Sequence, residues 1–256
     1  MTSAMTAVVL FDLDDTLFDH RGCTRDALAS LQHRYQSLRG LSVEAMNIEY
    51  SRLLEELHLQ VLAGLKTAEE ARIDRFMRLF AFGGAPVGRE TAGEAAATYR
   101  AAYIAGWRPI RFALELLAAL HGCVAVGVVT NNVALEQRQK ISACGFEPFL
   151  DAIVISEEAG VQKPDPRIFE IALSRLERAP EDAVMVGNAW ETDIAGARAA
   201  GIRPVWFNPR GDTSPDPSVA QIHSLEPTPD LLSMFCPSPE SRAPNPESRT
   251  PSPESR

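Results

Sequence analysis

The residues best suited to chemistry are acidic, and they follow a short apolar run near the start of the chain. Ala7–Asp12 is a short β-branched and apolar run that ends in an acid residue, and Asp14 and Asp15 follow after Leu13. This pattern predicts a buried strand with carboxylates at its carboxyl end. Asp12 and Asp14 are two residues apart, so their side chains can share one side of the strand end. Such a pair can divide the work, one carboxylate attacking as nucleophile and the other giving and taking protons.

Further polar residues follow or lie between later predicted strands: Thr130, Asn131, Lys163, Asn188 and Asp193. Taken singly, each has an ordinary structural explanation, such as a helix cap or a surface loop. Their order after successive strands is what indicates a site. Carboxylate and amide oxygens suit Mg²⁺, and the metal would relieve the repulsion between an attacking carboxylate and a phosphate. Lys163 and Thr130 add a charge and a hydroxyl for the phosphoryl oxygens.

The elements that must position these residues alternate between strand and helix. The predicted strands are Ala7–Asp12, Val124–Thr130, Ile153–Ser156, Ala183–Gly187 and Pro204–Phe207, and the predicted helices are Ile110–Leu120, Ala134–Cys144, Arg167–Leu176 and Asp193–Ala200. Short alternation of this kind predicts an α/β fold with a Rossmann-like, doubly wound parallel sheet. Ligands of such sheets bind beyond the carboxyl ends of the strands, where the polar residues collect.

Two segments depart from this alternation. Residues 19–103 contain apolar residues at helical spacing and no comparable strand, which predicts an all-helical domain inserted into a core made of 1–18 and 104–210. Residues 211–256 are rich in Pro and Ser and end in repeats of the Pro-Glu-Ser-Arg type. Because so few apolar residues are available for burial there, we expect a disordered tail.

Composition excludes several classes of function. The formal net charge of -9 argues against binding of nucleic acid or of an anionic membrane, since both require a positive field. The four cysteines are scattered, which gives no zinc or disulfide pattern. The start of the chain does not resemble a signal peptide, and no apolar run is long enough for a membrane span. We therefore expect a cytoplasmic protein; its oligomeric state is not indicated.

Together the polar residues resemble the four motifs of the haloacid dehalogenase-like superfamily. Phe11–Phe18 is similar to the first motif, D-x-D-x-T, and Val128–Asn131 to the second. Gly160–Phe169 resembles the third motif, and Val186–Asp193 with the following Ile-Ala-Gly-Ala resembles the fourth. The resemblance covers roughly Ala7 to Phe207.

The resemblance implies a Rossmann-like core with a helical cap inserted after the first motif, and a role for each motif residue. Asp12 would form an aspartyl-phosphate, and Asp14 would act as general acid and base. Thr130, Asn131 and Lys163 would bind the substrate. Asp12, Asp14 through its main-chain carbonyl, and the fourth-motif residues Asn188 and Asp193 would hold Mg²⁺, with Asn188 and Asp193 as alternative direct ligands.

Two residues bear on the reaction and point in different directions. Asp14 favours a phosphatase acting on a small phosphorylated metabolite or a nucleoside monophosphate, because family members that dehalogenate 2-haloacids lack a second Asp there. Asn188, however, stands where phosphatases usually have Asp, and Asn188-Ala189-Trp190 is closer to the dehalogenase version. We weight Asp14 more heavily, because it bears on protonation of the leaving group. A 2-haloacid dehalogenase and a catalytically silent regulatory protein are the alternatives.

Overall fold

The protein forms two compact units in the computed structural model, which describes residues 7–236. One unit is Phe18–Arg108, and the other is made of the chain before and after it. The sequence predicts the insertion over 19–103. Gly106–Arg108 belong with the helical unit because the Asp19 amide donates to the Arg108 carbonyl (3.1 Å) and Arg108 pairs with the Asp19 carboxylate (2.8 Å).

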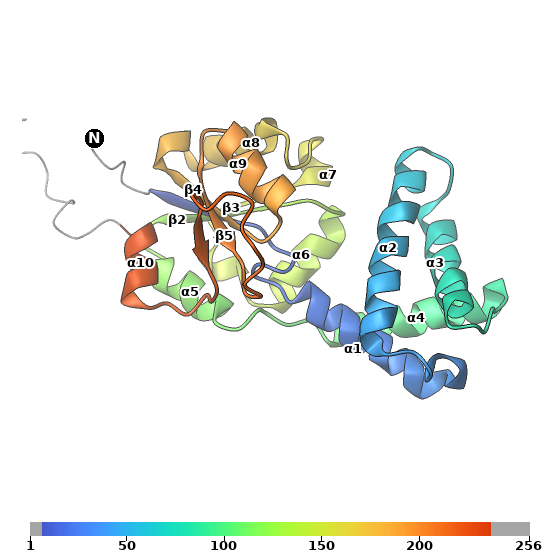
Figure 1. Ribbon diagram of the computed structural model, residues 1–256. Helices are drawn as coiled ribbons and strands as arrows, with labels where there is room; N and C mark the ends of the chain where they lie inside the picture. Colours follow the sequence, from blue (N-terminus) through green and yellow to red (C-terminus); the bar gives the residue numbers. More distant parts are fainter. Residues whose placement is uncertain (1–6, 237–256) are drawn as a thin grey trace, which may run out of the picture. The chain divides into compact units, whose positions relative to one another are not determined.

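The larger unit is built on a six-stranded sheet in the order β3-β2-β1-β4-β5-β6, with every neighbouring pair parallel (Figure 1). The strands are β1 Val8–Phe11, β2 Ala125–Thr130, β3 Ala152–Ile155, β4 Ala183–Gly187, β5 Arg203–Phe207 and β6 Ala220–Ile222. β1 lies between β2 and β4, where the strand order reverses. In such sheets a crevice opens at this point beyond the carboxyl ends of the strands, so the end of β1 is where a ligand is expected.

Helices cover both faces of this sheet (Figure 1). The helices are α5 Ala113–Leu120, α6 Ala134–Ala143, α7 Ser156–Ala159, α8 Pro166–Leu176, α9 Ala195–Ala199 and α10 Pro229–Phe235, with short turns η2 Glu147–Phe149, η3 Pro180–Asp182 and η4 Trp190–Ile194. Val8 and Leu10 of β1 pack with Ile168 and Phe169 of α8 in one buried cluster. Because the sheet is covered on both faces, β1, β3 and β4 are continuously apolar, as the sequence pattern predicts.

The smaller unit contains only helices: α1 His20–Arg34, η1 Gln36–Leu38, α2 Val43–Leu62, α3 Ala68–Phe82 and α4 Arg89–Ala105. The helix starts have local causes. Ser42 accepts from the Ala45 amide at the start of α2, and Thr67 and Glu70 form a reciprocal capping box at the start of α3. Aromatic rings fill the interior between the helices, with Tyr50, Phe76 and Tyr99 at centroid distances of 4.9–5.9 Å.

The α/β fold with a parallel sheet is confirmed, but the prediction for the end of the chain is wrong in part. Within Gly211–Cys236 the chain adds β6 to the edge of the sheet and places α10 beside α5 (Figure 1). The reason is that the few apolar side chains of this segment are mostly buried against the rest of the unit: Val219, Ile222, Leu225, Leu231 and Phe235. Residues 237–256, which the prediction also includes, lie outside the described part of the chain.

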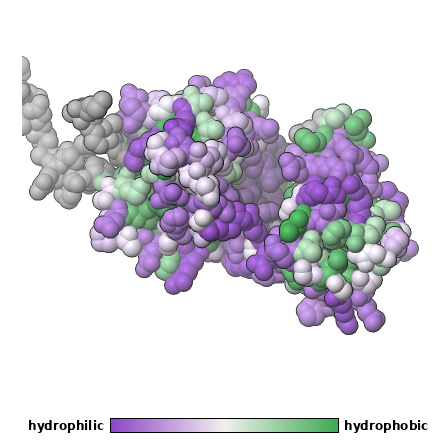
Figure 2. All heavy atoms as spheres, in the orientation of Figure 1, coloured by the Kyte–Doolittle hydropathy of each residue, from purple (hydrophilic) through white to green (hydrophobic). Residues whose placement is uncertain are grey.

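The visible face of both units is mostly hydrophilic (Figure 2). The large apolar side chains that are exposed are mostly on the helical unit, among them Ile48, Leu59 and Leu65. Of the helices in residues 7–236, none has the length and apolar character that crossing a membrane requires.

Candidate active site

Asp12 lies at the carboxyl end of the central strand β1. Its amide donates to the carbonyl of Val186 in β4 (2.9 Å), which extends the ladder between β1 and β4 by one residue and fixes where the side chain leaves the sheet. Asp12 is largely buried, with 7% of its surface exposed. A carboxylate fixed in this way at the switch point of the sheet is well placed to meet a ligand.

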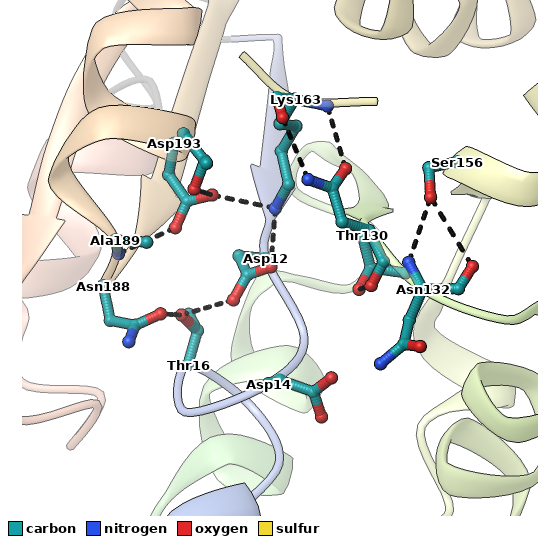
Figure 3. A network of polar contacts seen from close by, with 12 residues as sticks. Asp12, Asp14, Thr16, Thr130, Asn132, Ser156, Lys163, Asn188, Ala189 and Asp193 are labelled. Carbon is teal, nitrogen blue, oxygen red and sulfur yellow. Dashed lines mark hydrogen bonds and ion pairs between the residues drawn. The ribbon is translucent and has the colours of Figure 1, made fainter. Parts of the chain in front are cut away.

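Lys163 stands between two carboxylates (Figure 3). Its Nζ lies 2.6 Å from Oδ1 of Asp12 and 2.8 Å from Oδ1 of Asp193. The lysine is buried, so it is not the residue of a surface loop that its sequence context also allowed. The three charges sum to one negative charge, which is unfavourable away from water unless a further cation or proton is present.

The pKa values of this cluster reflect that imbalance. Burial raises the pKa of Asp12 from its ordinary 3.8 to about 7; Lys163 opposes the rise and Asp193 adds to it. Burial on its own would lower the pKa of Lys163, but the two carboxylates outweigh it and raise that pKa. Lys163 is therefore charged at neutral pH, whereas Asp12 binds a proton far more readily than an ordinary carboxylate.

Asp193 supports Lys163 from the turn after β4. Its Oδ2 accepts from the Ala189 amide (2.9 Å) while Oδ1 faces Lys163, and the residue is 1% exposed. Gly187 makes this packing possible, because a Cβ there would lie 2.4 Å from Oδ2 of Asp193. Both oxygens of Asp193 thus already have partners within the protein, and the residue is more deeply buried than Asn188.

Asn188 reaches Asp12 through a threonine. The Thr16 hydroxyl lies 3.1 Å from Oδ2 of Asp12 and 3.2 Å from Oδ1 of Asn188, and its single proton serves one of them at a time. Trp206 donates from Nε1 to the Asn188 carbonyl (2.9 Å), and Trp190 packs edge-on against Trp206. The Asn188 backbone is held in place, and its side-chain oxygen faces the same space as the Asp12 carboxylate.

The second-motif residues Thr130 and Asn131 do not cap the following helix, since no side-chain cap bond is made at the start of α6. Asn131 instead clamps the backbone of Lys163: its Nδ2 donates to the Lys163 carbonyl (2.9 Å), and its Oδ1 accepts from the Lys163 amide (2.8 Å). Asn131 therefore positions Lys163. Direct binding of substrate by Thr130 or Asn131 stays a prediction.

Asp14 points away from Asp12, so the two carboxylates do not share one side as their spacing suggested (Figure 3). Two partners come from α6: Lys140 Nζ lies 2.8 Å from Oδ1, and Gln137 Nε2 donates to Oδ2 (2.9 Å). The sequence reasoning missed Gln137 and Lys140. The only available sign was their position, three residues apart on the helix that follows the second motif, and charged residues on a helix are usually solvated.

The residues at the end of β1 fit a magnesium ion. No group of three or more His, Cys, Asp or Glu side chains suited to a metal occurs within residues 7–236. Magnesium does not need one, because it is commonly held by one or two carboxylates together with water and substrate oxygens. The Asp12 carboxylate and the Asn188 amide oxygen are hard oxygen donors bridged by one hydroxyl. The excess negative charge around Lys163 is what a divalent cation would offset.

Known proteins resemble this chain over most of its length. Residues 6–201 match the family model of the haloacid dehalogenase-like hydrolases. A glyceraldehyde 3-phosphate phosphatase of Methanopyrus kandleri is 31% identical over 77% of this chain and 82% of its own length. The human N-acylneuraminate-9-phosphatase is 28% identical over 89% of this chain and 94% of its own length.

Solved structures extend the similarity to the whole fold. A HAD hydrolase of Bacillus subtilis, bound to magnesium, has a TM-score of 0.68 and 25% identity, with 90% of this chain and 99% of that chain covered. A 2-haloacid dehalogenase of Pseudomonas syringae has a TM-score of 0.58 and 27% identity, with 91% and 100% covered. Relatives therefore include both phosphatases and a dehalogenase.

Proposed function

Since the chain belongs to the haloacid dehalogenase-like hydrolases, we propose that it is a magnesium-dependent phosphatase that works through an aspartyl-phosphate on Asp12. The observation that carries the proposal is the presence of two carboxylates with separate surroundings at the end of β1. Asp12 sits beside Lys163, and Asp14 is held apart by α6. Separate surroundings are what a nucleophile and a general acid need, because one must be ionised while the other holds a proton.

In this mechanism an oxygen of Asp12 attacks the phosphorus of a phosphomonoester, and the bond to the leaving oxygen breaks. Asp14 gives its proton to that oxygen, then takes a proton from the water that hydrolyses the aspartyl-phosphate. Lys163 faces the phosphoryl oxygens as a fixed charge, and the Thr130 hydroxyl adds a donor. Magnesium, when bound, supplies the positive charge that keeps Asp12 ionised and offsets the charge of the phosphoryl group.

Asn188 is the better candidate for a direct metal ligand. Asp193 is 1% exposed and has a partner on each oxygen, Lys163 and the Ala189 amide. Turning either oxygen of Asp193 onto a metal would weaken the contact which that oxygen makes, whereas Asn188 is only half-buried. We propose that Asp12, the main-chain carbonyl of Asp14 and the side-chain oxygen of Asn188 hold Mg²⁺, and that Asp193 fixes Lys163.

The proposed substrate is a small phosphomonoester, either a phosphorylated sugar-like metabolite or a nucleoside monophosphate. Support comes from the relatives, which are named as phosphatases of glyceraldehyde 3-phosphate and of an N-acylneuraminate 9-phosphate, and as a pyrimidine 5'-nucleotidase. These substrates share the phosphate ester and differ in the group that carries it. The proposal therefore extends to the ester and not to one metabolite.

Dehalogenation of 2-haloacids is a second candidate. Asn188-Ala189-Trp190 favours it, and a 2-haloacid dehalogenase is among the similar structures. Attack by Asp12 on carbon would release halide and needs no metal. Asp14 counts against it, since a halide leaving group needs no proton.

The test is release of phosphate from p-nitrophenyl phosphate, with Mg²⁺ and with a chelator. We expect turnover with Mg²⁺ only, and none from Asp12→Asn. Asp230→Asn is the matched control, because it makes the same change at an exposed position in the first turn of α10. Halide release from a 2-haloacid in the presence of the chelator would favour the second candidate. Absence of both reactions would favour a non-catalytic role.

A further inference from the structure

Two polar side chains of α6 are buried and directed at Asp14. Gln137 and Lys140 are three residues apart, so they lie on the same face of the helix, and both are 0% exposed. Each supplies a donor to a different oxygen of the Asp14 carboxyl group, Lys140 at 2.8 Å and Gln137 at 2.9 Å. With both of its oxygens engaged, this carboxyl group is fixed in rotation as well as in position.

This arrangement is difficult to explain by stability alone. Lys140 is fully buried, although lysine is among the residues least often found inside proteins. Gln137 has its Oε1 buried without a hydrogen-bond partner among the described residues. An unpaired amide oxygen costs free energy that an apolar side chain of similar shape would avoid. The side chain of Asp14 keeps 23% of its surface exposed, so water could have satisfied it without either partner.

Gln137 also connects Asp14 to the second motif. Its Nε2 lies 2.8 Å from the Thr130 hydroxyl as well as 2.9 Å from Asp14. The side-chain amide presents its nitrogen in this direction, as it must toward the ionised Asp14 carboxylate, which only accepts hydrogen bonds. Lys140 also pairs with Glu136 at 3.3 Å.

We propose that Gln137 and Lys140 are positioning residues that orient the carboxyl group of Asp14 for proton transfer to the leaving oxygen. The inference rests on the proposed phosphatase function. In the step concerned, a bond forms between an Asp12 oxygen and phosphorus, the bond to the leaving oxygen breaks, and the Asp14 proton passes to that oxygen. Neither Gln137 nor Lys140 exchanges a proton in this step. Their effect reaches the reaction only through Asp14.

Two aryl phosphates separate this role from a structural one. Phenyl phosphate has a strongly basic leaving group that needs the proton, whereas p-nitrophenyl phosphate has a weakly basic one that leaves without it. We expect Lys140→Met and Gln137→Leu to lower kcat/KM for phenyl phosphate at least ~10-fold more than for p-nitrophenyl phosphate. An equal loss with both esters, or no loss, would overturn the proposal.

The variants and controls keep the outcome clear. Lys140→Met preserves side-chain bulk and leaves Asp14 and Glu136 partly exposed to water. Gln137→Leu removes the unpaired amide oxygen, so this second variant should fold even if the first does not. Arg138→Met on the same helix removes an exposed ion pair with Glu158. This control should leave the ratio of kcat/KM for the two esters unchanged.

Combination with Asp14→Asn completes the test. If both residues act through Asp14, adding Lys140→Met or Gln137→Leu to Asp14→Asn should not further change the ratio of kcat/KM for phenyl phosphate to kcat/KM for p-nitrophenyl phosphate. A further change in the double variants would contradict the inference. Wild-type protein that releases phosphate from neither ester would refute the proposed function instead, and the inference would fall with it.

Discussion

We expect Asp12→Asn to raise the free energy of unfolding of the metal-free protein while it abolishes turnover. Asp12 and Asp193 place two carboxylates around one buried ammonium, that of Lys163. Replacing Asp12 by a neutral residue of the same shape leaves one carboxylate paired with one ammonium. Asn can still accept from Lys163 through its oxygen and donate to the Thr16 hydroxyl through its nitrogen, so the packing is retained.

The magnitude follows from the pKa of Asp12, which burial raises from 3.8 to about 7. The folded protein binds the Asp12 proton more tightly than the unfolded chain does. The contribution of this proton to the free energy of unfolding is therefore complete below pH 3.8 and is lost as the pH rises through about 7. The difference corresponds to roughly 4 kcal/mol at about 1.4 kcal/mol per pKa unit. Because 7% of Asp12 is exposed and water can reach it, we expect a gain of about 1–3 kcal/mol at pH 8.

The assay is urea unfolding in a chelating buffer at pH 5 and pH 8, for wild type, Asp12→Asn and the exposed control Asp230→Asn. The gain should be larger at pH 8 than at pH 5, with an unchanged dependence on urea concentration. A variant less stable than wild type at pH 8, or a gain that does not grow with pH, would refute the reasoning from buried charge. The control should show neither effect.

Three further variants test other parts of the structure. Lys163→Met leaves Asp12 and Asp193 buried without their cation, so the same urea assay at pH 8 should show a loss of about 3–5 kcal/mol; a loss below about 1 kcal/mol would contradict this. Gly187→Ala puts a Cβ 2.4 Å from Asp193, and displacement of the site should lower kcat for p-nitrophenyl phosphate by roughly 10–100-fold; wild-type kcat would show that the packing is loose. Phe235→Ala removes a fully buried ring of α10 and should cost about 3–5 kcal/mol of unfolding free energy, whereas no loss would mean that α10 adds little to the core.

The sheet and the motif residues on it could be predicted from the sequence because the buried strands appear in it as short, continuous apolar runs. Continuous apolar runs such as Ala183–Gly187 identified buried strands, and β4 has those bounds. Once the strands are parallel, residues that follow them must collect at one edge, and Asp12, Lys163 and Asp193 do meet there.

The partners of Asp14 could not be predicted because α6 carries polar side chains at consecutive positions. Glu136, Gln137, Arg138, Gln139 and Lys140 follow one another, so no periodicity shows which face is buried. Only the packing of α6 against the rest of the larger unit decides that Gln137 and Lys140 point inward while Arg138 faces solvent.

The elements β6 and α10 were missed for a different reason. The segment from Gly211 to Cys236 has the proline content of a tail, and the apolar residues around β6 are isolated. Leu231, Leu232, Met234 and Phe235 do fall at helical spacing after Thr228 and Pro229, but the proline content outweighed this short signal. The apolar residues of the segment become buried only because the edge strand β5 and helix α5 already offer surfaces to cover. Composition therefore described the local chain correctly and overlooked the tertiary contacts.

The central position of β1 affects the order in which the protein can fold during its synthesis. β1 pairs with β2 and β4, so Val8 must wait for Ala125 and Ala183 to be synthesised before its ladder can form. At about 5–20 residues per second, the wait for β2 alone lasts on the order of ten seconds. The segment Phe18–Arg108, which forms a compact unit of its own, is complete in the growing chain before β2 is made. β1, which ends next to the proposed nucleophile Asp12, is thus among the first parts translated, and its apolar Val8–Phe11 stretch has no strand to pair with until β2 follows.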